Sequence, residues 1–244
     1  MDGHEPIIKG FGLSFPNHFA LGNEFFCIIP GMEFTTLFFD LDDTLYPSNT
    51  GLWDAIRDRM SLYMHEKLGL SWESIPSLRH DYLEKYGTTL RGLQHHFQVD
   101  AEDYLAYVHD LPLEKYLAPD AAVRKVLLSL PQEKWVFTNA DSDHARRVLK
   151  VLTLEDCFQG VIDVRAVNFL SKPEKETYYK ALALAGNPDP RRCILFDDSP
   201  RNLAPARAIG FTTVLLSPDA QNHQADYTIS SLVEIPHALP MLWN

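Results

Sequence analysis

The chain has 244 residues, of which 45% are hydrophobic and 23% are charged, and its formal net charge is -11. That length suffices for one domain, or for one domain with an insert, and the composition is ordinary for a folded globular protein. A nucleic-acid surface needs clustered basic residues, so an excess of 33 acidic over 22 basic residues argues against a nucleic-acid partner. The apolar runs fall far short of the roughly 20 residues that span a bilayer, which argues against a membrane protein.

The cysteines and the N-terminal segment give two further expectations. Cys27, Cys157 and Cys193 include no C-x-x-C pair, which favours neither a disulfide framework nor a zinc site, and a reducing cytoplasmic location is expected. Residues 1–31 lack the charged and apolar regions of a signal peptide and show scattered aromatics without a period. We expect them to be a non-native or upstream extension; a short segment packed on the domain is the alternative.

The first clear strand is expected at residues 34–40, FTTLFFD, a nearly continuous apolar run that ends in acidic residues. Such a run is typical of a strand buried on both faces of a parallel sheet. Residues 51–112 then show helical patterning almost throughout, with Leu52, Ile56, Met60 and Tyr63 on one face. About 95 residues separate the first strand from the second, where an ordinary crossover needs only a dozen or more. The sequence therefore predicts a helical cap inserted after the first strand.

Four more strands are expected further along the chain, alternating with segments of helical period. Alternation of strand and helix predicts an α/β fold with a Rossmann-like, helix-covered parallel sheet. The expected organisation is an extension at 1–31, a core at 32–48 and 113–244, and a cap at 49–112. The later strands are predicted at 134–138, 160–164, 192–196 and 212–216, and helices around 123–130, 145–152 and 178–185.

Acidic residues follow two of these strands. Asp40 and Asp42 come directly after the first, where ligands bind in open α/β sheets, although acids are also common in turns and caps. Asp197 and Asp198 end the fourth strand as adjacent acids that repel one another unless a cation lies between them and Asp40. Magnesium suits such oxygen ligands and retains waters that a substrate phosphate can replace. The pattern predicts a Mg²⁺ site.

Polar residues at two other places complete this set. Thr138 and Asn139 end the second strand before a helix, where a hydroxyl and backbone amides can bind phosphate oxygens; simple capping is the alternative, and Asp141 is the expected N-cap. Lys172 lies at an expected helix start, where the helix dipole opposes a cation, so its placement suggests a role among the carboxylates.

The ordered set D-x-D-x-T from Asp40, then Thr138-Asn139, Lys172 and Asp197-Asp198 resembles the four motifs of the haloacid dehalogenase superfamily, over residues 34–216. The resemblance implies a HAD-like core and a phosphatase in which Asp40 attacks phosphorus and binds metal. It implies that Asp42 is acid then base, with its carbonyl on the metal. Thr138, Asn139 and Lys172 would hold the phosphoryl group, and Asp197 and Asp198 would bind Mg²⁺. A dehalogenase proper is disfavoured, because that reaction has no leaving oxygen to protonate.

The cap segments YGTTLRGL and YVHDLP, with LYP at 45–47, TNAD at 138–141 and His144 nearby, resemble those of the pyrimidine 5'-nucleotidase branch. This resemblance implies a nucleoside monophosphate substrate, UMP or CMP. Thr88 and Arg91 are the candidate substrate contacts, because an arginine beside a glycine can reach over a phosphate or a base. Another small-metabolite phosphatase and a phosphosugar mutase with the same core remain alternatives. The sequence does not indicate the oligomeric state.

Overall fold

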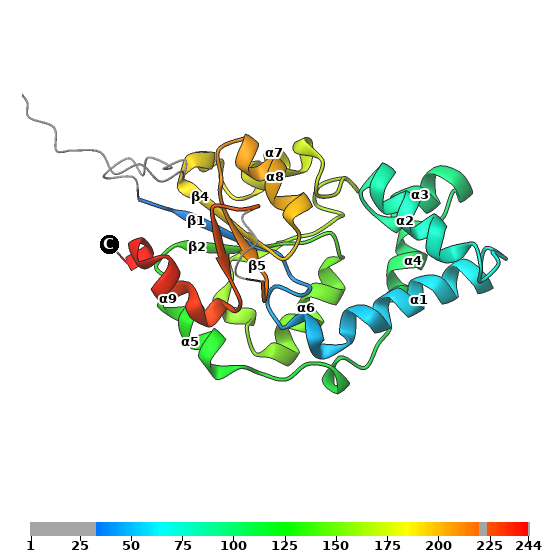
Figure 1. Ribbon diagram of the computed structural model, residues 1–244, viewed down its shortest axis with the longest axis horizontal. Coiled ribbons are helices and arrows are strands. Elements are labelled where there is room, and N and C mark those ends of the chain that lie inside the picture. The colour runs from blue at the N-terminus through cyan, green and yellow to red at the C-terminus, as the bar shows by residue number, and fades with distance from the viewer. Residues whose placement is uncertain (1–32, 220–223, 244) are drawn as a thin grey trace, which may run out of the picture. The chain divides into compact units, whose positions relative to one another are not determined.

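The computed structural model describes residues 33–219 and 224–243. The expectations for residues 1–31 lie outside this part. Within the described residues six parallel strands form one sheet, in the order β3-β2-β1-β4-β5-β6 (Figure 1). The predicted α/β fold with a parallel sheet is therefore confirmed. The strands are β1 (Thr36–Phe39), β2 (Glu133–Phe137), β3 (Gly160–Ile162), β4 (Cys193–Asp197), β5 (Thr212–Leu216) and β6 (Tyr227–Ile229).

Strand β1 lies at the centre of the sheet, and this position explains its apolar sequence. All four of its residues are buried, because side chains alternate between two covered faces. Leu37 and Phe39 join one core cluster, and Phe38 joins the other. Phe39 stacks on Phe196 of β4, with ring centroids 4.4 Å apart. The central position of β1 brings the residues after it to the middle of the sheet edge.

Helices cover both faces of the sheet. In Figure 1, α7 (Lys175–Leu184) and α8 (Pro200–Ala208) lie on one side, while α5 (Ala121–Ser129), α6 (Ser142–Leu152) and α9 (Ile235–Ala238) lie on the other. The apolar periods predict α5, α6 and α7 to within a few residues. Strand β6 was not predicted, because three residues are too few to show a period. No helix in the described ranges is both long and apolar enough for a membrane span.

Between β1 and β2 the chain forms a helical insert, defined here as α1 (Leu52–Glu66), α2 (Ile75–Tyr86), α3 (Thr89–Phe97) and α4 (Ala101–Val108). These helices bury a cluster of their own that includes Tyr63, Leu93 and Tyr104. Helix α2 ends at Gly87, whose φ of 87° suits glycine and allows the sharp turn into α3. The predicted helical character of 51–112 matches these four helices, and whether they act as a cap stays a prediction.

Candidate active site

The ends of two neighbouring strands, β1 and β4, bring the predicted acidic residues to one place. Phe39 pairs with Val136 of β2 on one side and with Phe196 of β4 on the other. Asp40, one residue further along, donates its backbone N–H to the carbonyl of Phe196 at 2.8 Å, which sets Asp40 beside Asp197. This is the point where the strand order changes direction, and ligands bind at such points in open α/β sheets.

Lys172 joins the two acids from a different segment. Its Nζ lies 2.9 Å from Oδ1 of Asp40 and 2.6 Å from Oδ2 of Asp197, and the lysine is only 1% exposed. Burial alone would lower the pKa of Lys172, but Asp197 and Asp40 raise it above its ordinary value, so the lysine is a cation. Helix α7 begins only at Lys175. Lys172 thus lies in the loop of residues 163–174 between β3 and α7, called the Lys172 loop below, so the helix dipole does not act on it as expected.

Asp40, Asp197 and Asp198 form a group in which one oxygen of each carboxylate lies within 4.8 Å of the others. Burial and the neighbouring acids raise the pKa of Asp40 well above its ordinary range, despite Lys172. Burial and Asp197 likewise raise the pKa of Asp198 to about 7. Three carboxylates face one lysine here, so the group lacks positive charge. An all-oxygen donor set with this deficit fits Mg²⁺.

Hydrogen bonds fix Asp197 and the Lys172 loop. Oδ1 of Asp197 accepts from the backbone N–H of Ser199 at 2.9 Å and from Nδ2 of Asn202 at 3.0 Å. The side chain of Asn139 bonds both backbone groups of Lys172, accepting from its N–H at 2.8 Å and donating to its carbonyl at 3.0 Å. Asn139 therefore holds the Lys172 loop against the end of β2, and its contact with phosphate stays a prediction.

The hydroxyl of Thr138, which is 2% exposed, accepts a hydrogen bond from the backbone N–H of Ala140 at 3.0 Å. This bond shapes the turn between β2 and α6, and within the described residues the hydroxyl donates no hydrogen bond. Asp141 is the N-cap of α6, as expected: its Oδ1 accepts from the N–H groups of Asp143 and His144, both at 3.0 Å. Phosphate binding by Thr138 remains a prediction.

Asp42 lies outside the three-carboxylate group and has its own partners. Its Oδ1 accepts a hydrogen bond from Oη of Tyr46 at 2.6 Å and lies 3.3 Å from Nε2 of His144. Burial would raise the pKa of Asp42, but the contacts with His144 and Tyr46 outweigh it and lower that pKa. The structure thus separates a carboxylate held by a tyrosine and a histidine from carboxylates paired with a lysine.

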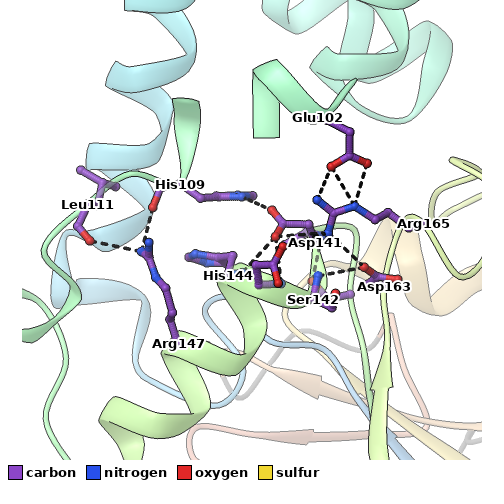
Figure 2. Close-up of polar contacts among 12 residues, drawn as sticks. Glu102, His109, Leu111, Asp141, Ser142, His144, Arg147, Asp163 and Arg165 are labelled. Carbon is purple, nitrogen blue, oxygen red and sulfur yellow. Dashed lines mark hydrogen bonds and ion pairs between the residues drawn. The ribbon is translucent and has the colours of Figure 1, made fainter. Parts of the chain in front are cut away.

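His144 belongs to a second buried group, shown in Figure 2. Its ring stacks on that of His109, with centroids 4.1 Å apart and planes at 17°. Nδ1 of His109 lies 2.6 Å from Oδ2 of Asp141, and a carboxylate only accepts hydrogen bonds, so His109 donates. Arg147 of α6 donates to the carbonyls of His109 and Leu111 at 2.8 and 3.2 Å. These hydrogen bonds therefore hold the segment that follows α4 against helix α6.

The two candidate substrate residues lie on α3 of the insert, next to the Lys172 loop. Thr88 caps α3, accepting a hydrogen bond from the N–H of Arg91 at 3.3 Å. Arg91 forms an ion pair with Glu174, two residues after Lys172. A Cβ added to Gly87 would lie 2.8 Å from the hydroxyl oxygen of Ser171, so this corner of the insert touches the loop. Both residues border the site, and their contact with a substrate stays a prediction.

Some contacts were not anticipated from the sequence. Tyr46 and His144 were noted only as parts of a resemblance, without a partner. A signal did exist for Tyr46, which follows Asp42 by four residues, and for His144, which lies in the first turn of the helix after β2. Nothing in the sequence indicated the ion pair of Arg91 with Glu174, because these residues are far apart along the chain.

Comparisons with known proteins agree with this geometry. The family model of haloacid dehalogenase-like hydrolases matches residues 34–210. Phosphate metabolism protein 8 of Saccharomyces cerevisiae is 27% identical over 226 residues, which cover 82% of this chain and 70% of that protein. A HAD phosphatase from Thermococcus onnurineus has a TM-score of 0.57 at 22% identity, covering 83% of this chain and 96% of that one. CbbY from Rhodobacter sphaeroides, solved with phosphate, has a TM-score of 0.63 at 17% identity, covering 86% and 99%.

The family model covers well over half of the chain and includes every candidate site residue named above. The chain therefore belongs to the haloacid dehalogenase-like hydrolases. The solved structures are too distant in sequence to show more than the shared fold.

Proposed function

We propose that this chain is a magnesium-dependent phosphomonoesterase that works through an aspartyl phosphate on Asp40. The observation that carries the proposal is the pairing of two kinds of carboxylate at one strand end. Asp40 lies against Lys172 and two further acids, while Asp42 is held by Tyr46 and His144 instead. Because the two carboxylates have separate partners, they can take different roles in one reaction.

Asp40, Asp197 and Asp198 are the residues that would hold Mg²⁺, and the backbone carbonyl of Asp42 is the further ligand that the family resemblance implies. Their all-oxygen donor set and their uncompensated negative charge support this assignment. When bound, the ion supplies positive charge that lowers the repulsion between the Asp40 carboxylate and a phosphate dianion.

In the proposed reaction a carboxylate oxygen of Asp40 attacks phosphorus in line with the leaving oxygen. Lys172 Nζ, already within 3 Å of Asp40, carries charge that offsets the phosphoryl oxygens. Asp42 gives its proton to the leaving oxygen as the phosphorus–oxygen bond breaks. A water molecule then attacks phosphorus, Asp42 takes the proton of that water, and inorganic phosphate leaves with Asp40 restored.

For the substrate we propose a pyrimidine nucleoside monophosphate, UMP or CMP, hydrolysed by a cytoplasmic enzyme. The sequence of the helical insert and the position of Thr88 and Arg91 beside the Lys172 loop support this choice. A relative named for phosphate metabolism and a similar fold solved with phosphate support phosphate chemistry more broadly. Cys157 and Cys193 are free and buried, which suits a reducing compartment.

The test is phosphate release from UMP, CMP, sugar phosphates and phosphoglycolate, with Mg²⁺ and after chelation with EDTA. We expect the pyrimidine nucleotides to be hydrolysed fastest and EDTA to abolish activity until Mg²⁺ is restored. Asp40→Asn should remove turnover and leave the melting temperature close to that of the wild type, because it creates no cavity. Asp110→Asn makes the same change at an exposed acid and is the matched control.

Acid quenching during turnover should also trap phosphate on the protein in a form that hydroxylamine cleaves, as expected of an acyl phosphate. Full activity of Asp40→Asn, or activity that survives complete chelation, would contradict the mechanism. Preferred hydrolysis of a sugar phosphate would retain the mechanism and replace the proposed substrate.

A further inference from the structure

Both donors to Asp42 reach the same oxygen. Oη of Tyr46 and Nε2 of His144 lie 2.6 and 3.3 Å from Oδ1. In the described part of the chain, Oδ2 makes no hydrogen bond. Tyr46 is 4% exposed and His144 is 1% exposed, so neither donor can move aside without disturbing the packing around it. The carboxyl group of Asp42 is therefore held by one oxygen with the other left available.

His144 is itself fixed from two directions. Its backbone N–H is bonded to the side chain of Asp141, which places it in the first turn of α6. Its ring lies against His109, whose Nδ1 donates to the other oxygen of Asp141 (Figure 2). Burial would raise the pKa of Asp141, but these hydrogen bonds lower it, so Asp141 remains a carboxylate that orients the His109 ring and holds the backbone of His144. The backbone bond to Asp141 and the stacking on His109 hold the ring of His144, and its Nε2 lies toward Asp42.

We propose that Tyr46 and His144 are positioning residues that hold Oδ1 of Asp42 and so present Oδ2, with its proton, to the leaving oxygen. This inference rests on the proposed phosphomonoesterase function, in which Asp42 is the general acid. A carboxyl group that accepts two hydrogen bonds on one oxygen carries its proton on the other, because the lone pairs of the first are engaged. General acid catalysis requires that the proton lie within hydrogen-bond reach of its acceptor.

The consequence is a dependence on the leaving group that a purely structural role would not produce. The 5'-oxygen of uridine is strongly basic and needs a proton as it departs from UMP. The phenolate of 2,4-dinitrophenyl phosphate is a weak base and departs without one. Because kcat/KM reports the steps up to departure of the leaving group, comparing it for these two substrates isolates the acid role of Asp42.

His144→Phe keeps a ring against His109 and removes the donor. We expect it to lower kcat/KM for UMP by about ten- to a hundredfold, part of the 10² to 10⁴ that general acid catalysis supplies, and to change the dinitrophenyl ester by less than about threefold. His144→Gln, which retains an N–H donor of similar reach, should recover most of the loss. Tyr46→Phe removes the second donor and should show the same dependence on the leaving group.

The matched control is His65→Phe, at a histidine of α1 that stacks on Trp72 with centroids 4.5 Å apart and has no contact with Asp42. It should leave the ratio of the two kcat/KM values unchanged. Equal losses on both substrates, or no loss on either, would overturn the proposal. If His144→Phe does not fold, Tyr46→Phe and His144→Gln decide by the same ratio. If the wild-type enzyme releases phosphate from neither UMP nor 2,4-dinitrophenyl phosphate, the proposed function itself is refuted. If UMP alone is not turned over, another alkyl monophosphate takes its place.

Discussion

Replacing Gly92 by alanine gives two opposite expectations, which makes its effect on stability informative. Gly92 lies buried inside α3, and alanine is favoured over glycine in a helix interior by about 1 kcal/mol. From helix propensity alone, Gly92→Ala should therefore stabilise the protein. The tertiary structure predicts the opposite, because α2 crosses α3 at this residue.

A Cβ on residue 92 would lie 2.1 Å from Cγ, 2.4 Å from Cβ and 2.6 Å from Cδ1 of Tyr82. Carbon atoms in contact prefer separations of about 3.5–4.0 Å, so the two helices would have to separate by roughly 1 Å. The tyrosine ring cannot relieve this by rotating, since its Cβ moves only with the backbone of α2 and its ring stacks on His96. Overpacking of this kind costs about 1–3 kcal/mol.

Taking the upper end of that range and subtracting the gain in helix propensity leaves a net loss of about 2 kcal/mol. For a chain of this size the melting temperature should fall by about 4–8 °C. Thermal unfolding followed by circular dichroism, with urea titration alongside, measures both quantities. The turn between α2 and α3 touches the Lys172 loop at Gly87. A shift of these helices should therefore also disturb the site and raise KM for UMP.

A double-mutant cycle with Tyr82→Ala separates the close contact from other effects. That change removes Cγ and Cδ1 but leaves Cβ, so Gly92→Ala should cost less in this background, though not nothing. Ala106→Gly, at an exposed position inside α4, measures helix propensity without the contact. A rise in stability for Gly92→Ala, or an equal cost in both backgrounds, would refute the reasoning.

Two other predictions concern specificity and pH. Arg91→Ala should lower kcat/KM for UMP by about ten- to a hundredfold and p-nitrophenyl phosphate much less, whereas Glu174→Gln should have little effect. Equal losses of kcat/KM in the two variants would show that Arg91 acts only through its ion pair with Glu174. Burial and His144 lower the pKa of His109 below its ordinary 6.5, despite Asp141. As the pH falls, the unfolded chain therefore binds a proton at this histidine before the folded protein does. The contribution of His109 to the free energy of unfolding is fully present above pH 6.5 and is lost as the pH falls toward the pKa of the folded state. Between about pH 7 and 5 the melting temperature of His109→Gln should fall less than that of the wild type. An equal fall in the two proteins would contradict this prediction.

Five strands of the sheet and the position of the acidic residues can be predicted from the amino-acid sequence alone. Continuous apolar runs predict strands buried on both faces, and parallel strands end at a common edge, so Asp40 and Asp197 could be expected together before any coordinates. The capping role of Asp141 also followed from local chemistry, because an N-cap bonds residues only two and three positions away.

Contacts between segments far apart along the chain have no local signal in the sequence and depend on how the chain folds. His144 reaches Asp42 across 102 residues, and Arg91 meets Glu174 between an insert helix and a core loop. Asn139, predicted to bind phosphate, also holds the backbone of Lys172, a contact that no sequence pattern indicated. Which donor meets which acceptor depends on how helices pack on the sheet, and that packing is set by the summed burial of many side chains. The hydrophobic period of a helix shows which of its faces is buried, but it does not show which other element that face packs against.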